Sequence, residues 1–156
     1  MTYQRHPRGA HTARLHAQRM APISERRLAA LRAEVEAEEK KYGGQGEAQV
    51  VFGTQLSDVL KKWEAEFAAK YPQDAQWGKV MGPRDWLKEM TGLHIRRIYG
   101  LLEAEYRFVS LSQADLILTV IERSDLLYDV IHVIPNPNWS PERWLAYMNE
   151  RGCGDG

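Results

Sequence analysis

The sequence predicts an all-α protein, a small helical bundle that contains a helix-turn-helix. An N-terminal basic arm and a helix precede the bundle, and a C-terminal helical appendage follows it. Three observations lead to this prediction. Apolar residues recur at three- and four-residue spacing in several windows, the period of a helix that buries one face. Proline and glycine stand at the ends of these windows, where helices start and stop. Two of the windows are joined by a turn built on one glycine.

The composition is that of one folded domain with appendages. The chain has 156 residues, of which 44% are hydrophobic and 27% charged, and this excludes wholesale disorder. No window approaches the roughly 18 consecutive apolar residues of a membrane span, and no apolar secretory signal stands at the N-terminus. We therefore expect a cytoplasmic protein without membrane contact. Cys153 is the only cysteine, so an intrachain disulfide or a cysteine zinc cluster is excluded.

Positive charge is concentrated at the N-terminus. The formal net charge of the chain is zero, but residues 1–33 carry seven arginines against one glutamate. A basic arm on an acidic body can follow a DNA backbone, although such a run is as often a solvated tail. We predict that residues 1–22 form a flexible basic arm. Its candidates for auxiliary DNA contact are Arg5, Arg8, Arg14 and Arg19.

Residues 23–46 are predicted to form a charged helix and a glycine-rich linker. Ser24 caps the helix, which ends near Tyr42 at a glycine pair. The apolar face is too short for a self-sufficient coiled coil, so the helix docks on the body or on a second copy of the chain. That face consists of Leu28, Leu31 and Val35.

Residues 47–123 are the predicted helix-turn-helix DNA-binding domain. Its first helix runs from about Thr54 to Tyr71, where Pro72 stops it. Pro83 then opens the next helix at its first turn.

The most specific feature is the segment 84–102, RDWLKEMTGLHIRRIYGLL. Gly92 can adopt the left-handed conformation that the tight turn of a helix-turn-helix requires. A helix from His94 would then enter the major groove of DNA. Alternatively, the glycine turn joins a helix pair that only packs a bundle. The apolar residues that would lock the two helices together are Leu87, Leu93, Ile98 and Leu101.

The outward side chains of the second helix are the candidate base readers. Arg96 or Arg97 can bond a guanine through two hydrogen bonds. His94 and Tyr99 can donate to bases or phosphates, and Ile95 can pack on a thymine methyl group. The other predicted DNA contacts are Arg84, Lys88, Thr91 and Arg107.

The run WLKEMTGLHIRRIYGLLEAEYRFVSLSQADLILTVI, residues 86–121, resembles helix-turn-helix proteins of actinobacteria and their phages. These are related to lambda-repressor-like and phage immunity repressor domains. The resemblance implies a basic loop in which Arg107 faces phosphates, and a closing helix capped by Ser112. Lys88 stands where the family usually has alanine, and must reach out past the packed helices. His94 stands where the family usually has serine or a similar cap. The closing helix would fill its core with Leu116, Ile117, Leu118, Val120 and Ile121.

Residues 124–156 are predicted to be a C-terminal appendage. The apolar run 127–134 is compatible with an extension of the preceding helix or with a short strand. Ser140 then caps, and Pro141 opens, a last helix. An aromatic cluster at this end covers the core, forms a partner surface or extends the DNA contact. The cluster consists of Trp139, Trp144 and Tyr147.

These observations predict a sequence-specific DNA-binding transcription regulator, repressor-like and of bacterial or phage origin, which joins the nucleoid when bound. Its partners would be double-stranded DNA and either a second copy or another protein. The sequence shows no phosphate loop, nucleophile elbow or metal-ligand spacing. We therefore expect neither catalysis nor a metal or cofactor. The alternative is a non-catalytic adaptor, or a phage structural or accessory protein, that uses the helix-turn-helix as a scaffold.

Overall fold

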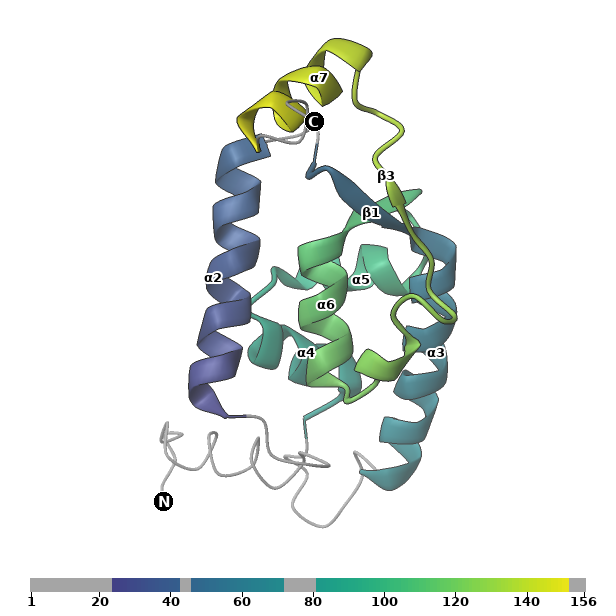
Figure 1. The fold of residues 1–156 in the computed structure, drawn as a ribbon. Helices are drawn as coiled ribbons and strands as arrows, with labels where there is room; N and C mark the ends of the chain where they lie inside the picture. The colour runs from purple at the N-terminus through teal and green to yellow at the C-terminus, as the bar shows by residue number, and fades with distance from the viewer. Residues whose placement is uncertain (1–23, 43–45, 72–80, 152–156) are drawn as a thin grey trace.

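The computed structural model describes residues 24–42, 46–71 and 81–151, so the predicted arm and its four arginines lie outside the described residues. Helices account for most of the described chain, and a small sheet joins them (Figure 1). The helices are α2 (Glu25–Tyr42), α3 (Gly53–Lys70), α4 (Pro83–Thr91), α5 (Ile95–Leu102), α6 (Leu111–Val120) and α7 (Pro141–Glu150), with a 3-10 turn at Ser124–Leu126. The strands are β1 (Gln49–Phe52), β2 (Phe108–Ser110) and β3 (Val133–Pro135).

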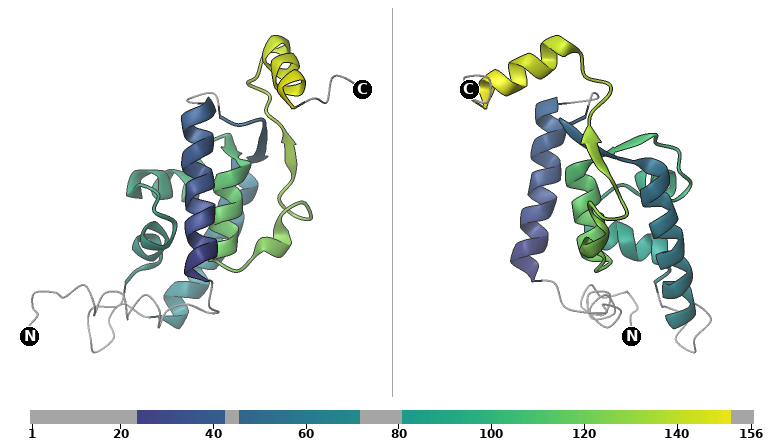
Figure 2. Two further views of the ribbon diagram at one scale, coloured as in Figure 1. Left: turned by 60° about the vertical axis from the view of Figure 1, so that its left-hand side comes forward. Right: turned by 45° about the vertical axis from the view of Figure 1, so that its right-hand side comes forward.

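Helix α6 lies at the centre of the core. It packs against α2 on one side and α4 on another, and both β1 and β2 contact it (Figures 1 and 2). The five apolar residues predicted to fill this helix are all buried, with Leu116, Ile117 and Leu118 wholly inaccessible. Burial of this much apolar surface is the main force that holds the surrounding helices together.

The prediction of an all-α protein is wrong in one respect, because the three strands form an antiparallel sheet in the order β2-β1-β3. Val50 of the central strand pairs with Ser110 on one side and with Ile134 on the other. Strands of three or four residues are too short for an alternating pattern to show in the sequence. The pairing also decides the open question in the run 127–134, since β3 begins at Val133.

The N-terminal helix α2 docks on the body of its own chain. The Ser24 hydroxyl accepts a hydrogen bond from Arg27 N (3.1 Å), which confirms it as the cap. The three residues of the predicted apolar face are buried against the core around α6. Those residues are Leu28, Leu31 and Val35.

Helix α7 is tied to the end of α2 by the aromatic cluster. Ser140 caps α7 by accepting from Arg143 N (3.1 Å). Trp139 is buried, donates its indole N–H to Gly46 O (3.1 Å), and its ring lies 5.3 Å from that of Tyr42. The tryptophan therefore serves packing, while Leu145 on α7 remains 61% exposed.

The start of α6 differs from the prediction. Its N-cap residue is Ser110, and Ser112 lies buried in the first turn. The Glu47 carboxylate does the capping instead, because its Oε1 accepts from Ser112 N (2.8 Å). A carboxylate at this end also interacts favourably with the helix dipole. In the described parts of the chain, no helix has both the length and the apolar character needed to cross a membrane.

Candidate nucleic-acid interface

The turn between α4 and α5 is built on a glycine in the left-handed conformation, as the sequence predicts. Gly92 adopts φ 77° and ψ 4°, the left-handed conformation, and its N–H donates to Lys88 O (2.8 Å). The Thr91 hydroxyl donates to Leu87 O (2.7 Å) and accepts from Leu93 N (3.2 Å). Thr91 is 2% exposed, so its expected contact with DNA is incompatible with the structure. Its hydroxyl is used to close the turn.

An arginine of α2 holds the end of α4 in place. The Arg32 guanidinium donates to Glu89 O (2.7 Å) and to Met90 O (3.0 Å). These carbonyls belong to the last turn of α4, which has no helical donors for them and carries the negative end of the helix dipole. This role of Arg32 was not predicted from the sequence, because 58 residues separate Arg32 from Met90.

His94 is the N-cap of α5. Its backbone is extended (φ −64°, ψ 145°), and its Nδ1 accepts a hydrogen bond from Arg96 N (3.0 Å). The imidazole therefore caps the helix, which is the role that the resemblance implies for a serine at this position. The helix itself begins one residue later, at Ile95.

The two helices are locked by the predicted apolar residues. Leu87 and Ile98 are completely buried, Leu101 is nearly so, and Leu93 packs partly buried against the same core. Ile95 also packs against this core while remaining partly exposed. Its side chain is therefore shared between the core and the surface that we expected to face DNA.

Arg96 and Tyr99 form the outward face of α5. Both side chains are exposed, and Tyr99 is 48% accessible. Among the described residues no hydrogen bond or ion pair involves the Arg96 side chain, which leaves all its donors available in this part of the chain.

Arg84 lies next to this face but is already paired. Its guanidinium bonds Glu64 Oε2 (2.7 Å) and Glu103 Oε2 (3.0 Å), and stacks 4.8 Å from the Tyr99 ring centre. The hydrogen bond that Arg84 donates to Glu64 is the main cause that raises the pKa of Arg84 further above its ordinary value. These bonds connect α4 with α3 and with the end of α5. Because two carboxylates already balance its charge, Arg84 contributes little attraction for phosphate.

Lys88 and Arg107 both reach into solvent. Lys88 extends from α4 with its Nζ 3.6 Å from Glu89 Oε2, so the long side chain fits past the packed helices as expected. The Arg107 guanidinium lies over the Phe108 ring at 5.3 Å, at the start of β2.

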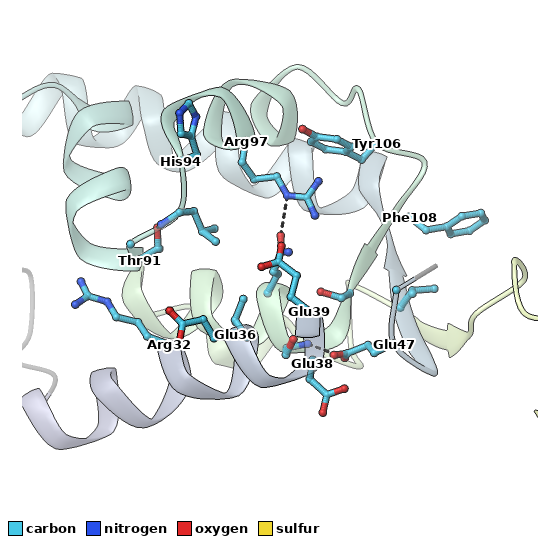
Figure 3. Close-up of a pocket in the computed structure, with 18 of the residues that line it drawn as sticks. Arg32, Glu36, Glu38, Glu39, Glu47, Thr91, His94, Arg97, Tyr106 and Phe108 are labelled. Carbon is cyan, nitrogen blue, oxygen red and sulfur yellow. Dashed lines mark hydrogen bonds between the residues drawn. The ribbon is translucent and has the colours of Figure 1, made fainter. Parts of the chain in front are cut away.

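Arg97 points into a groove between α5 and α2 (Figure 3), and Arg96 is not among the residues that line this groove. Its Nε donates to Gln113 Oε1 (3.0 Å), and its guanidinium stacks 4.3 Å from the centre of the Tyr106 ring. The two adjacent arginines are therefore not equivalent: Arg96 faces solvent, whereas Arg97 lines the groove.

Charges around the interface are mixed. Glu36 and Glu39 of α2 line the same groove as Arg97. The surface is therefore not uniformly basic, which makes the position of each arginine more important than the total charge. Within the described ranges no cluster of three histidine, cysteine or acidic side chains is placed to hold a metal ion.

No protein-family model matches this chain, and no curated protein or solved structure is significantly similar to it. The features of the molecule that bear on its function are therefore α4, the turn and α5.

Proposed function

We propose that the protein is a sequence-specific DNA-binding transcription regulator, repressor-like and of bacterial or phage origin. The observation that carries this proposal is the Gly92 turn, which holds α4 and α5 together while Arg96 and Tyr99 face outward from α5. A short helix with its N-terminal residues exposed is what major-groove readers present to base edges.

The proposal gives different tasks to the side chains. Arg96 bonds a base edge, most suitably O6 and N7 of a guanine, and Tyr99 beside it donates to a base or a phosphate. Lys88 and Arg107 contact the backbone, which sets the position of the protein without reading sequence. Arg97 adds positive potential from the groove and takes no direct part in base reading.

The alternative is a non-catalytic adaptor that uses the helix-turn-helix as scaffold. The carboxylates of Glu36 and Glu39 beside Arg97 favour it, because like charge repels phosphate. Exposed Leu145 and Met148 on α7 also favour a protein partner. An adaptor would show no retention of duplex DNA that depends on salt.

The test is selection of bound sequences from a random duplex library, followed by affinity measurements at several salt concentrations. Affinity for the selected site should fall steeply as salt rises. Arg96→Ala should weaken binding to that site by about tenfold or more, the worth of a good bidentate contact, and relax the preference at one base pair. Arg151→Ala, at the end of the distant helix α7, is the matched control and should leave affinity and preference unchanged.

Two results would contradict the proposal. One is the absence of any enriched sequence together with salt-insensitive retention, which favours the adaptor. The other is an Arg96→Ala variant that selects the same sequence with the same affinity, which removes α5 from base reading. A palindromic selected site would imply that two copies bind with two-fold symmetry.

A further inference from the structure

The groove beside the helix-turn-helix has the size of a small-molecule site. This open groove has a volume of about 760 Å³ and lies between α2 and the turn, and the first turn of α6 and the Glu47 segment also line it (Figure 3). Sites for small molecules in proteins commonly measure about 300–1,000 Å³. Apolar side chains also line it, among them Val35, Leu93 and Phe108.

Opposite charges line two sides of this groove. Glu36 and Glu39 project from α2, and Arg97 projects from α5. The Arg97 guanidinium uses only its Nε for Gln113, so its two terminal nitrogens keep donors for a ligand. In the described ranges no carboxylate forms an ion pair with Arg97.

Unused buried polar groups lie between the charged walls. Glu47 is 8% exposed, and while Oε1 is bonded to Ser112 N, Oε2 has no hydrogen-bond partner. The hydroxyl of Ser112 is likewise buried without a partner. Buried polar atoms normally find a partner, so these two groups indicate a place where a ligand or water completes the bonding. Both residues line the groove.

The distribution of charge disfavours two simple ligand classes. A plain anion would meet the carboxylates of four glutamates, and a plain cation would meet Arg97 and the charge of Arg32. The four glutamates are Glu36, Glu38, Glu39 and Glu47. A molecule with an ammonium group and a carboxylate satisfies both walls. The fork of an arginine guanidinium forms two parallel hydrogen bonds with a carboxylate, as it also does with a phosphate.

We propose that this groove binds a small amino-carboxylate compound, a free α-amino acid or a dipeptide. Its carboxylate bonds the terminal nitrogens of Arg97, its ammonium faces Glu39 and Glu47, and its side chain packs on Val35 and Leu93. This site is separate from the proposed DNA contacts of Arg96 and Tyr99, and it stands whether or not the protein binds DNA.

The test is a titration of the full chain, followed by backbone amide NMR shifts, with the common L-amino acids and their dipeptides as probes. At least one probe should produce saturable shifts at Gly92, Ser112 and Gln113. For that probe, the decarboxylated amine and the deaminated acid should each bind about tenfold more weakly or worse, because each loses a charge-assisted hydrogen bond.

Variants then assign the two walls. Arg97→Gln and Glu39→Gln should each weaken binding about tenfold, by the same loss of a charge-assisted bond. Glu39 is exposed, so its replacement keeps the test valid if the Arg97 variant is unstable. The matched controls are Arg151→Gln and Glu66→Gln, which should bind as the parent does. Arg151 directly follows α7 and Glu66 lies on α3, and both are exposed and outside the groove. The proposal is overturned if no probe causes saturable shifts in the groove. It is also overturned if the decarboxylated amine and the deaminated acid bind as tightly as the intact probe, or if the Arg97 and Glu39 variants both retain full affinity.

Discussion

The Arg32 guanidinium of α2 donates to the Met90 carbonyl at the end of α4, and so connects α2 to the α4–α5 pair. The same side chain also bonds Glu89 O. Arg32 lies directly beside the turn, because a Cβ added at Gly92 would be 3.6 Å from Arg32 Nε. Helix α2 is therefore part of the framework that fixes the angle at which α5 is presented.

Replacement of Arg32 by methionine should lower the free energy of unfolding by about 2 kcal/mol, the usual worth of hydrogen bonds from a charged donor. Methionine keeps most of the apolar stem, so the loss reports the hydrogen bonds. Urea denaturation measures it through a shifted midpoint at unchanged slope. Arg26→Met, an exposed position on the same helix, is the control and should change stability little. Equal losses in the two variants would show that the bonds to α4 contribute nothing.

Gly92→Ala should cost about 1–2 kcal/mol, because an L-residue is strained in the left-handed conformation at φ 77°. The nearest atom to an added Cβ is 3.6 Å away, so steric overlap does not contribute. Gly92→Asn should recover part of the loss, since asparagine tolerates this conformation better than alanine. Thermal denaturation of the three proteins checks the order glycine, asparagine, alanine. If alanine were as stable as asparagine, the turn would have adjusted its backbone.

His94→Ala should destabilise the protein by about 1 kcal/mol, the typical worth of an N-cap, because Arg96 N loses its acceptor. His94→Ser restores a capping oxygen and should recover most of that loss. The same pair of variants separates structure from recognition. If His94 also contacts DNA, the serine variant will regain stability without regaining affinity for the selected site. Full recovery of both properties would limit His94 to capping.

Glu47→Gln should change how stability depends on pH. Burial raises the pKa of the Glu47 carboxyl, the hydrogen bond that it accepts from Ser112 N opposes this, and Glu38 and Glu34 add to the rise. The folded state therefore binds this proton more tightly than the unfolded state does. The contribution of Glu47 to stability is consequently present at acid pH and is lost as the pH rises from 4.5 through the raised value.

A glutamine at position 47 keeps an acceptor for Ser112 N and has no charge to bury. At neutral pH Glu47→Gln should be at least as stable as the parent, by up to about 1 kcal/mol, the lower end of the cost of an unsatisfied buried group. Urea denaturation across the pH range measures the difference, which should shrink as the pH falls below 4.5. Glu66→Gln, an exposed position on α3, should show no such change. The opposite result would contradict this account of Glu47: a stability difference that favours the parent at neutral pH and moves in favour of Glu47→Gln at acid pH.

Much of the helical organisation could be predicted because its signals are local. Ser24 and Ser140 each bond a backbone N–H three residues further on, so the cap and its partner lie within one sequence window. The same holds for Pro83 and Gly92 at the two ends of α4. The boundaries of the predicted domains remain a prediction, although both α2 and β3 pack against the central body.

The features that escaped prediction depend on partners distant in the chain. The cap of α6 comes from Glu47, which is 65 residues before Ser112, so Ser112 itself was wrongly expected to cap. Gly53 is another example: its N–H donates to Arg107 O, and an added Cβ would lie 1.7 Å from Tyr106 O. The two backbones approach this closely because β1 and β2 pair beside them in the sheet. The sheet itself was not predicted from the sequence.

At the candidate interface, local residue patterns were enough to predict that a glycine turn joins two amphipathic helices and that two arginines follow it. They could not predict that Arg96 faces solvent while Arg97 turns into the groove towards Gln113, because this depends on the packing of distant elements. Helical periodicity predicts which residues share a face of α5. Whether a face is exposed or lines a groove depends on which element packs beside it. Here α2 and α6 frame the groove beside α5, and their placement follows from burial of their own apolar faces against a common core.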